Sequence, residues 1–476
     1  MKSVKIFLII LSVCAGLSNL SAQQPDSLME YLGIAARNNP GVQQKFYEYQ
    51  AALQKIPQAG SLSDPELNVG IFLSPMELIG GNQVAEIQLM QMFPWFGVLK
   101  NSKDEMSLMA NARFESMRDA KLQVFYDVQR TWYELHRIHE NIRISEKNLA
   151  ILRTLERISL VRYKSAPSGS VPSSSVNNTG GTTGSSAAPA SQGMGGMGGN
   201  NNSTTPAVSP SMSSAPMGSS GGTGLSDLYR IQIEIANLEN SIALLQNQRS
   251  TVVARFNAFL NRPPQTSVSL PDSLIMQQTG ISLASISDTM LARNPMINML
   301  QYEQQSLEAR KRMVTRMGYP MVGLGLNYTL INKNEMSTSP MNGEDMIMPM
   351  VKVTLPIYRK KYKSMQKEAD LLKTAAEQGI QATANSLQTE YYEAVQAYQD
   401  AGRRIELYKN QSQLAQKSLD IMIKSFSSSS ASASLSDILA IRQQTLDFEM
   451  KRIEALTDYN TAVAWLKRLM ANSEVN

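Results

Sequence analysis

Two long stretches of the chain carry apolar residues at every third or fourth position. No proline interrupts residues 98–163 or 359–426, and glycine is absent from the first stretch. The apolar stripes are Leu122, Phe125, Val128, Trp132, Leu135 and Ile138, and then Leu387, Tyr391, Val395 and Tyr398. The pattern predicts two helices of about 100 Å that pack, as in coiled coils, on other helices or other chains. Shorter helices at 226–260 and 436–469 are predicted to run back along them.

Four shorter segments alternate apolar residues with polar residues or glycine, two ahead of each long helix. They lie at about 66–74, 84–93, 321–331 and 346–356. Period-two alternation predicts β-strands with one apolar face. Two interpretations remain, a soluble sandwich and a transmembrane barrel closed by several chains, and we favour the barrel because four strands cannot shield themselves.

Where these strands meet the helices, the sequence is rich in aromatic residues. Phe93, Trp95, Phe96 and Tyr358 are candidates for an interfacial belt in a membrane, with ordinary packing at strand ends as the alternative. The loops at the other end of the strands, Gly80–Asn82 and Ser337–Asp345, are then predicted to be the outer loops.

The same short motifs occur twice in the same order. The pairs are Asn39-Pro40 and Asn294-Pro295, Pro65 and Pro320, Phe93-Pro94 and Leu355-Pro356, and Leu225–Leu228 and Leu435–Ile438. The chain is therefore predicted to hold a signal peptide (1–22), a first structural repeat (23–270) and a second repeat (271–476). An insertion at 165–224 belongs to the first repeat alone.

The N-terminus has the pattern of a secretory signal. Lys2 and Lys5 precede an apolar core, and small residues lead to an expected cleavage site after Ala22. The sole cysteine, Cys14, lies inside this segment; a membrane anchor and a lipidated Cys14 are the disfavoured alternatives. The mature chain would then have no thiol for disulfides, zinc sites or catalysis.

The remaining composition points away from an enzyme. The formal net charge of +5 is too small to argue for nucleic acid, and we find no nucleophile motif, P-loop or dinucleotide fingerprint. No cofactor is expected. The two histidines, His136 and His139, are interpreted as part of a solvated helix face rather than a metal pair.

Methionine is the compositional outlier, with 28 residues. The insertion has no charged residue and is predicted to be disordered, yet it holds Met194, Met197, Met212 and Met217. A second group, Met336, Met341, Met346, Met348 and Met350, falls on the last predicted loop and strand. Thioethers are soft ligands for Cu(I) or Ag(I), so heavy-metal export is one hypothesis. Compositional drift with flexible packing is the favoured alternative.

Long helix pairs, duplicated, with two strands inserted in each copy, resemble the TolC-type outer-membrane efflux channels. The resemblance covers essentially the whole mature chain and is carried by the Asn-Pro pairs, Phe93–Gly97, Leu355–Tyr358 and the Leu-Ser-Asp-Leu/Ile segments. It implies a mainly α-helical homotrimer whose four strands per chain form a 12-stranded β-barrel in outer-membrane lipid. It also implies an α-helical barrel in the periplasm, docked to a periplasmic adaptor protein and an inner-membrane pump.

The resemblance also implies a gate at the periplasmic helix turns. Asp437 matches the first gate aspartate of the family, Asp227 is its equivalent in the first copy, and Ala440 replaces the usual second aspartate. Helix capping beside Ser436 is the alternative role of Asp437. The expected function is a passive outer-membrane exit duct. A periplasmic adaptor and an extracellular coiled-coil protein are the alternatives, and the cargo and pump family stay open.

Overall fold

The computed structural model describes residues 28–78, 80–165, 224–277, 290–338, 340–427 and 434–471. The predicted signal peptide and the candidate soft-metal residues Met194, Met197, Met212 and Met217 lie outside the described residues. The chain divides into two compact units. One combines the residues up to Lys147 with those from Asn240 onward, and the other runs from Asn148 to Glu239.

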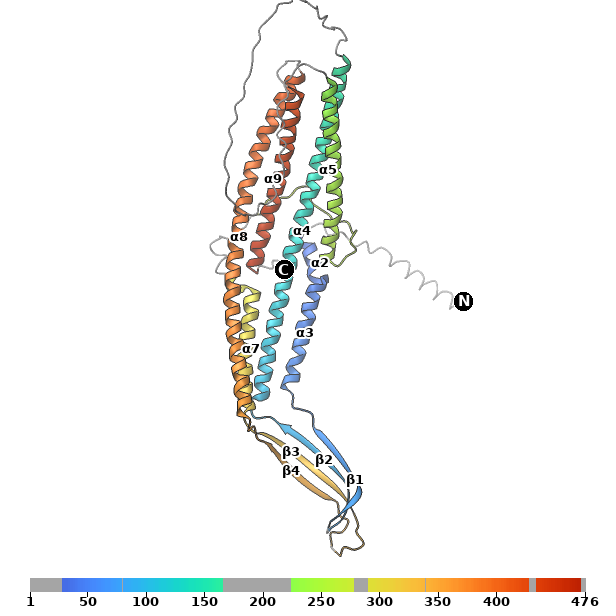
Figure 1. The fold of residues 1–476 in the computed structure, drawn as a ribbon, viewed down its shortest axis with the longest axis vertical. Coiled ribbons are helices and arrows are strands. Elements are labelled where there is room, and N and C mark those ends of the chain that lie inside the picture. Colours follow the sequence, from blue (N-terminus) through green and yellow to red (C-terminus); the bar gives the residue numbers. More distant parts are fainter. Residues whose placement is uncertain are drawn as a thin grey trace, which may run out of the picture. The chain divides into compact units, whose positions relative to one another are not determined.

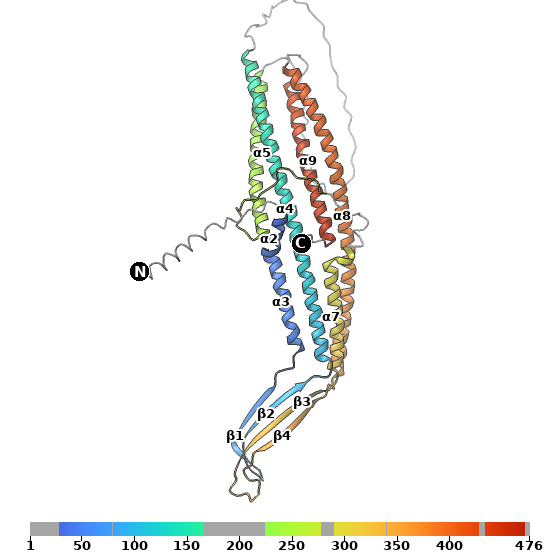
Figure 2. The same ribbon diagram turned by 180° about the vertical axis from the view of Figure 1, so that it is seen from behind.

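Two very long helices are present, as the apolar stripes predict. Helix α4 (Val98–Ser165) has 68 residues and α8 (Arg359–Ser427) has 69. The shorter helices are α2 (Leu28–Asn38), α3 (Pro40–Gly60), α5 (Gly224–Phe259), α7 (Pro295–Met317) and α9 (Leu435–Leu469). Figures 1 and 2 show α8 beside both α7 and α9, the helices on which it packs. No helix among the described residues combines the length and the apolar character that a membrane crossing requires.

The repeated Asn-Pro dipeptide begins a helix in the same way in both copies. Asn39 caps α3 with φ −63° and ψ 121°, and Asn294 caps α7 with φ −64° and ψ 123°. Each side-chain oxygen accepts hydrogen bonds from the backbone N–H groups two and three residues later. The proline follows at the first helical position, where its missing N–H costs nothing.

Two buried clusters use corresponding positions of the two repeats. The first includes Ala35, Phe125, Trp132, Phe256 and Leu260, from α2, α4 and the end of α5. The second includes Met290, Leu387, Ala394, Leu466 and Met470, from the α7 region, α8 and the end of α9. The five residues named for the first cluster precede their five counterparts by the intervals that separate the duplicated motifs, which are 255 residues in α2, 262 in α4 and 210 at the end of α5. The duplication therefore extends to the packing of the helices.

The unit from Asn148 to Glu239 is a helix hairpin built from the end of α4 and the start of α5. Arg153 forms an ion pair with Glu239 at 2.8 Å, and the Gln232 amide donates to Glu156 at 3.0 Å. The apolar side chains Leu152, Leu155, Leu228, Ile231 and Leu238 are buried. This unit pairs two antiparallel helices, as the reversed helix at 226–260 predicts.

The expectation of a solvated histidine face is wrong for His136. This side chain is buried, and its Nε2 lies 3.2 Å from the carbonyl oxygen of Pro271, beside the Trp132 ring. Burial lowers the pKa of His136 below its usual value, although the Glu140 carboxylate opposes the shift. The segment after α5 covers this part of α4, which the helical pattern of α4 alone did not reveal.

One antiparallel sheet holds the four strands in the order β1-β2-β3-β4 (Figure 1). Its strands are β1 (Glu66–Leu78), β2 (Gly81–Phe93), β3 (Met321–Asn332) and β4 (Met346–Thr354). β1 runs past the predicted end at residue 74, because the register shifts between Ile71 and Met76 and pairing then resumes. β4 ends before Pro356, which has no N–H for a ladder.

Candidate functional site

The apolar face of the sheet is exposed. Leu67, Leu89 and Leu326 lie opposite one another on three neighbouring strands, and Leu67 is 63% and Leu89 49% exposed. The same face continues through Val69, Ile71, Ile87, Leu324, Leu330, Val351 and Val353, all exposed. An apolar surface of this extent marks an interaction with a partner or a membrane. A soluble sandwich with this face buried does not describe the chain.

The opposite face is polar and less exposed. Asn68, Gln88, Asn327 and Met348 form one cross-strand row. On this face Met90 is 5% exposed, whereas its apolar neighbour Leu89 on the other face is half exposed. Gln88 and Asn327 are half-buried, whereas Asn68 and Met348 at the two ends of the row are exposed. The apolar face is thus the more exposed of the two, the reverse of a water-soluble sheet, which buries its apolar face.

The strand–helix junction gathers aromatic rings from both repeats. Trp95, which follows β2, stacks on Tyr319 ahead of β3 with centroids 5.4 Å apart, and Phe96 lies 6.0 Å from Trp95. Tyr319 is not among the predicted junction residues, because the residue before Pro65 in the first copy is Asp64 and not an aromatic residue. Gly97 then turns the chain into α4 with φ +87°, a conformation that favours glycine. Of the other predicted junction residues, Phe93 and Tyr358 are both exposed.

The two predicted outer loops are joined at the far end of the sheet. Gly343 N donates to Gly80 O at 2.9 Å, which links the loop after β1 to the loop after β3. Asp345 accepts a hydrogen bond from Ile331 N at 3.1 Å and another from the Tyr328 hydroxyl. The loops are therefore held by one hydrogen bond between the repeats and by two within the second repeat.

Both candidate gate aspartates lie in the first turn of a helix. Asp437 is exposed in α9, whose N-cap is Ser434 rather than Ser436; the Ser434 hydroxyl oxygen accepts from Ser436 N at 3.3 Å. Asp227 lies in the first turn of α5, in the other compact unit. A carboxylate in the first turn interacts favourably with the helix dipole. Both residues can therefore stabilise the start of their helix independently of a role in a gate.

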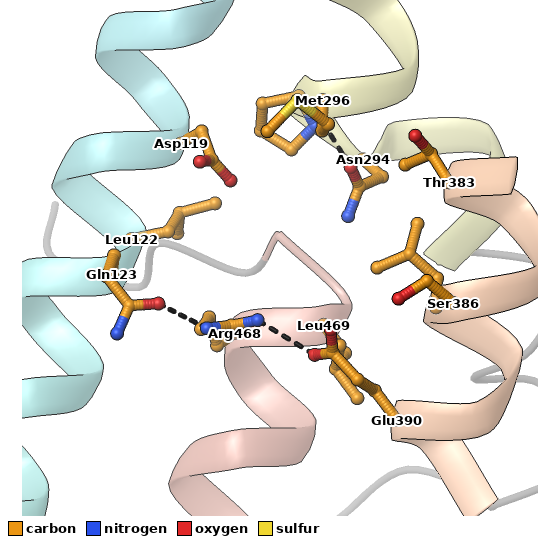
Figure 3. Close-up of a pocket in the computed structure, with 12 residues that line it drawn as sticks. Asp119, Leu122, Gln123, Asn294, Met296, Thr383, Ser386, Glu390, Arg468 and Leu469 are labelled. Atoms are coloured by element: carbon orange, nitrogen blue, oxygen red, sulfur yellow. Dashed lines mark hydrogen bonds and ion pairs between the residues drawn. The ribbon is translucent and has the colours of Figure 1, made fainter. Parts of the chain in front are cut away.

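A cavity of about 310 Å³ lies between α4, α7, α8 and α9 (Figure 3). Arg468 crosses it and donates to the Glu390 carboxylate at 2.9 Å and to the Gln123 amide oxygen. Burial raises the pKa of Asp119 above its usual value; Arg468 opposes this shift and Glu390 adds to it. The cavity is thus a polar junction of both repeats.

A second cavity, of about 490 Å³, is lined by α3, α4, α7 and α8. Burial raises the pKa of the Glu105 carboxyl there, and the nearby Arg310 guanidinium opposes the shift. The Ser306 hydroxyl contacts Met109 Sδ at 3.3 Å. Within the described parts of the chain, no group of three His, Cys, Asp or Glu residues is arranged to hold a metal ion.

No protein-family model and no curated protein matches the sequence. Solved structures do match. The outer membrane protein VceC from Vibrio cholerae is 12% identical, with a TM-score of 0.66 over 93% of this chain and 96% of that one. The CmeC outer membrane channel of Campylobacter jejuni is 13% identical, with a TM-score of 0.68 over 93% and 85% of the two chains.

The open-state MtrE outer membrane channel of Neisseria gonorrhoeae is similar to the same degree. It is 13% identical, with a TM-score of 0.67 over 94% of this chain and 89% of that one. The likeness spans helices and sheet together, because it covers nearly all of both chains. The chain therefore has the fold of these outer membrane channels, and the resemblance to TolC-type channels that its sequence predicts is confirmed at the level of the fold.

Proposed function

We propose that this protein is a passive outer-membrane exit duct of a tripartite efflux or secretion system. The observation that carries the proposal is the reversed sheet, whose apolar face is exposed and is the more exposed of its two faces. A strand with one side in lipid and the other on an aqueous passage has this distribution. The fold shared with solved outer membrane channels supports the same function.

The free edges of the sheet call for more than one copy. β1 and β4 each have a hydrogen-bonded neighbour on one side only, and open edges are not tolerated in a bilayer. Three copies of the four-stranded sheet would close a 12-stranded barrel, as in a homotrimer. β1 of one chain would then pair with β4 of the next, antiparallel to it.

The helices carry an unpartnered seam that fits the same assembly. Leu407, Leu414 and Ile421 are spaced seven residues apart on α8, and all three are exposed. Heptad spacing is typical of a coiled-coil contact, in which each apolar side chain enters a gap on the facing helix. A neighbouring copy would cover this seam in an α-helical barrel in the periplasm.

The gate and the partners belong to the same proposal. The gate would lie at the helix turns that carry Asp437 and Asp227, on the periplasmic side, where an adaptor protein and an inner-membrane pump would dock. Three copies would bring three Asp437 carboxylates together, and like charges at close range repel. Opening would follow from untwisting of the helix turns around Asp437.

The proposal is tested by cross-linking in intact cells. Single cysteines placed along residues 67–71 of β1 are combined with cysteines along residues 351–354 of β4, after removal of Cys14 with the signal. The expected result is a ladder up to a trimer in the outer-membrane fraction. A control pair, Ile87→Cys with Tyr328→Cys, faces across β2 and β3 of one chain and should give no oligomer. A soluble periplasmic monomer would contradict the duct and favour an adaptor.

A further inference from the structure

Methionines flank the two glycines of β3 on the polar face of the sheet. In the register of the strands, Met90 of β2 and Met350 of β4 lie on either side of Gly325. Met92 lies beside Gly323 in the next row. Because strands two apart are separated by about 10 Å, methionine side chains from both sides can extend over a glycine that leaves the middle open.

The sulfur atoms occupy the space that these glycines leave. A Cβ at Gly323 would lie 2.6 Å from Met92 Sδ and 3.3 Å from Met90 Sδ. A Cβ at Gly325 would lie 3.0 Å from Met90 Sδ. Met90 and Met92 therefore direct their thioethers to one point, while the Gln88 amide contacts Met350 Sδ at 3.9 Å on the same face.

We propose that Met90, Met92 and Met350 form a binding site for a soft monovalent cation such as Cu(I). The placement of this site on the passage wall rests on the proposed duct; the site itself rests on the three thioethers. Thioether sulfur is a neutral, polarisable ligand that selects Cu(I) and Ag(I) over hard cations. Met90 is buried while Met92 and Met350 are partly exposed, so an ion approaching the polar face reaches the sulfurs.

The charges around the site leave selectivity to the sulfurs. Glu66 lies opposite Met90 on β1, and Lys352 lies in the row of Met92 and Gly323 on β4. One carboxylate and one ammonium offset each other, so general electrostatic attraction for cations is weak. The methionine side continues along β4 through Met348 and Met346, which extends the soft surface toward the outer loops.

Methionine also fills irregular gaps, so packing has to be separated from binding. The test is a titration of Ag(I) alone into the purified, detergent-solubilised protein. The Met90→Leu, Met92→Leu, Met350→Leu triple variant keeps volume and apolar character but removes the sulfurs. The matched control, Met336→Leu with Met341→Leu, removes two exposed thioethers of the β3–β4 loop.

We expect one tight Ag(I) site per chain in the wild type and in the loop control. The triple variant should weaken it by about tenfold or more, as expected when soft ligands are lost. X-ray absorption of the loaded wild type should show a sulfur-only first shell. Gly323→Ala, which keeps all three methionines but fills the point where two sulfurs meet, should weaken binding as well. Equal titrations of the wild type and the triple variant would overturn the site.

Single-channel conductance of the same preparations separates this inference from the proposed duct. If the wild type conducts in planar bilayers but shows no Ag(I) site in the titration, the soft-metal site is refuted and the proposed duct is retained. If the titration shows a thioether site but the protein does not conduct, the site is retained and its placement on a passage wall is refuted.

Discussion

Arg468 and Glu390 form an ion pair at 2.9 Å that holds the end of α9 against α8. The same guanidinium contacts the Gln123 amide oxygen on α4 and lies 5.7 Å from the Tyr126 ring. One side chain of the second repeat therefore joins both long helices. The pair is three-quarters buried on the arginine side, so water weakens it only in part.

Arg468→Ala should lower the free energy of unfolding by about 1–2 kcal/mol, because charge-assisted hydrogen bonds are lost and Glu390 stays beside the cavity without its cation. Urea unfolding in mild detergent measures the change. Arg153→Ala is the control, since its pair with Glu239 is about half exposed. That variant should lose less than about 1 kcal/mol. Equal losses for the two variants would show that the Arg468 contacts add nothing beyond a surface pair.

The two asparagine caps should differ in strength. Asn39→Ala and Asn294→Ala each remove an N-cap, which should lower the free energy of unfolding by about 1 kcal/mol. Asn39 also donates through Nδ2 to Phe259 O at 2.9 Å, so its variant should lose about 1 kcal/mol more. Asn39→Asp keeps the cap acceptor and removes the amide donor, and should lose that second part alone. Unfolding midpoints of the three variants measure this, and an Asn39→Asp equal to wild type would exclude the Phe259 contact as a source of stability.

His136 should make the folded state less stable in mild acid. Its pKa is lowered in the folded chain, so below about pH 6.5 the unfolded chain binds a proton that the folded chain does not. Stability is therefore complete above that pH and declines as pH falls toward the lowered pKa. His136→Gln, which can still donate to Pro271 O, should reduce the difference between unfolding midpoints at neutral pH and about pH 5. An equal difference in His136→Gln and in the wild type would contradict this origin of the pH dependence.

Asp437→Ala should make the closed channel leaky, if the proposed gate is right. In a trimer the substitution removes three carboxylates and so changes the charge at the proposed mouth. In each chain it removes one first-turn carboxylate, which should lower the stability of α9 by only about 0.3–1 kcal/mol. Conductance and antibiotic exclusion measure whether the gate closes, and an unfolding curve measures the loss of helix stability. A variant that loses stability but conducts and excludes antibiotics like wild type would assign Asp437 to capping. Asp447→Ala, further along α9, is the control.

The long helices followed from the sequence because their determinants are local. The absence of proline over residues 98–163 and 359–426 and a steady apolar period are sufficient for a helix, and Asn-Pro is a self-contained start signal. The strands were also recognisable, but β1 was predicted too short because its alternation is interrupted at the register shift after Ile71. Local patterns locate elements and do not locate irregular pairing.

The missed features depend on segments far apart in the chain. His136 has a polar side chain on a helix, and its contact to the later segment is the one with Pro271 O. Tyr319 gains its role from Trp95, which belongs to the other repeat. The N-cap of α9 is a local exception. Helix α9 begins at Leu435 with Ser434 as its N-cap, and the sequence did not distinguish Ser434 from Ser436 because both are serines and cap a helix equally well. The gate role of Asp437 and Asp227 stays a prediction, since it concerns several chains at once.

The reversed sheet also has a consequence for the order in which the molecule matures. The helices have buried clusters of their own, whereas the sheet has an apolar side turned outward and two open edges. Such a sheet in water is prone to pair with any exposed strand. In the proposed duct, the helical part would therefore become stable before the sheet does, and the strands would reach their final state last, when neighbouring copies and lipid are both in place. A chain that travels to the membrane in this way would need protection at residues 66–93 and 321–354 above all.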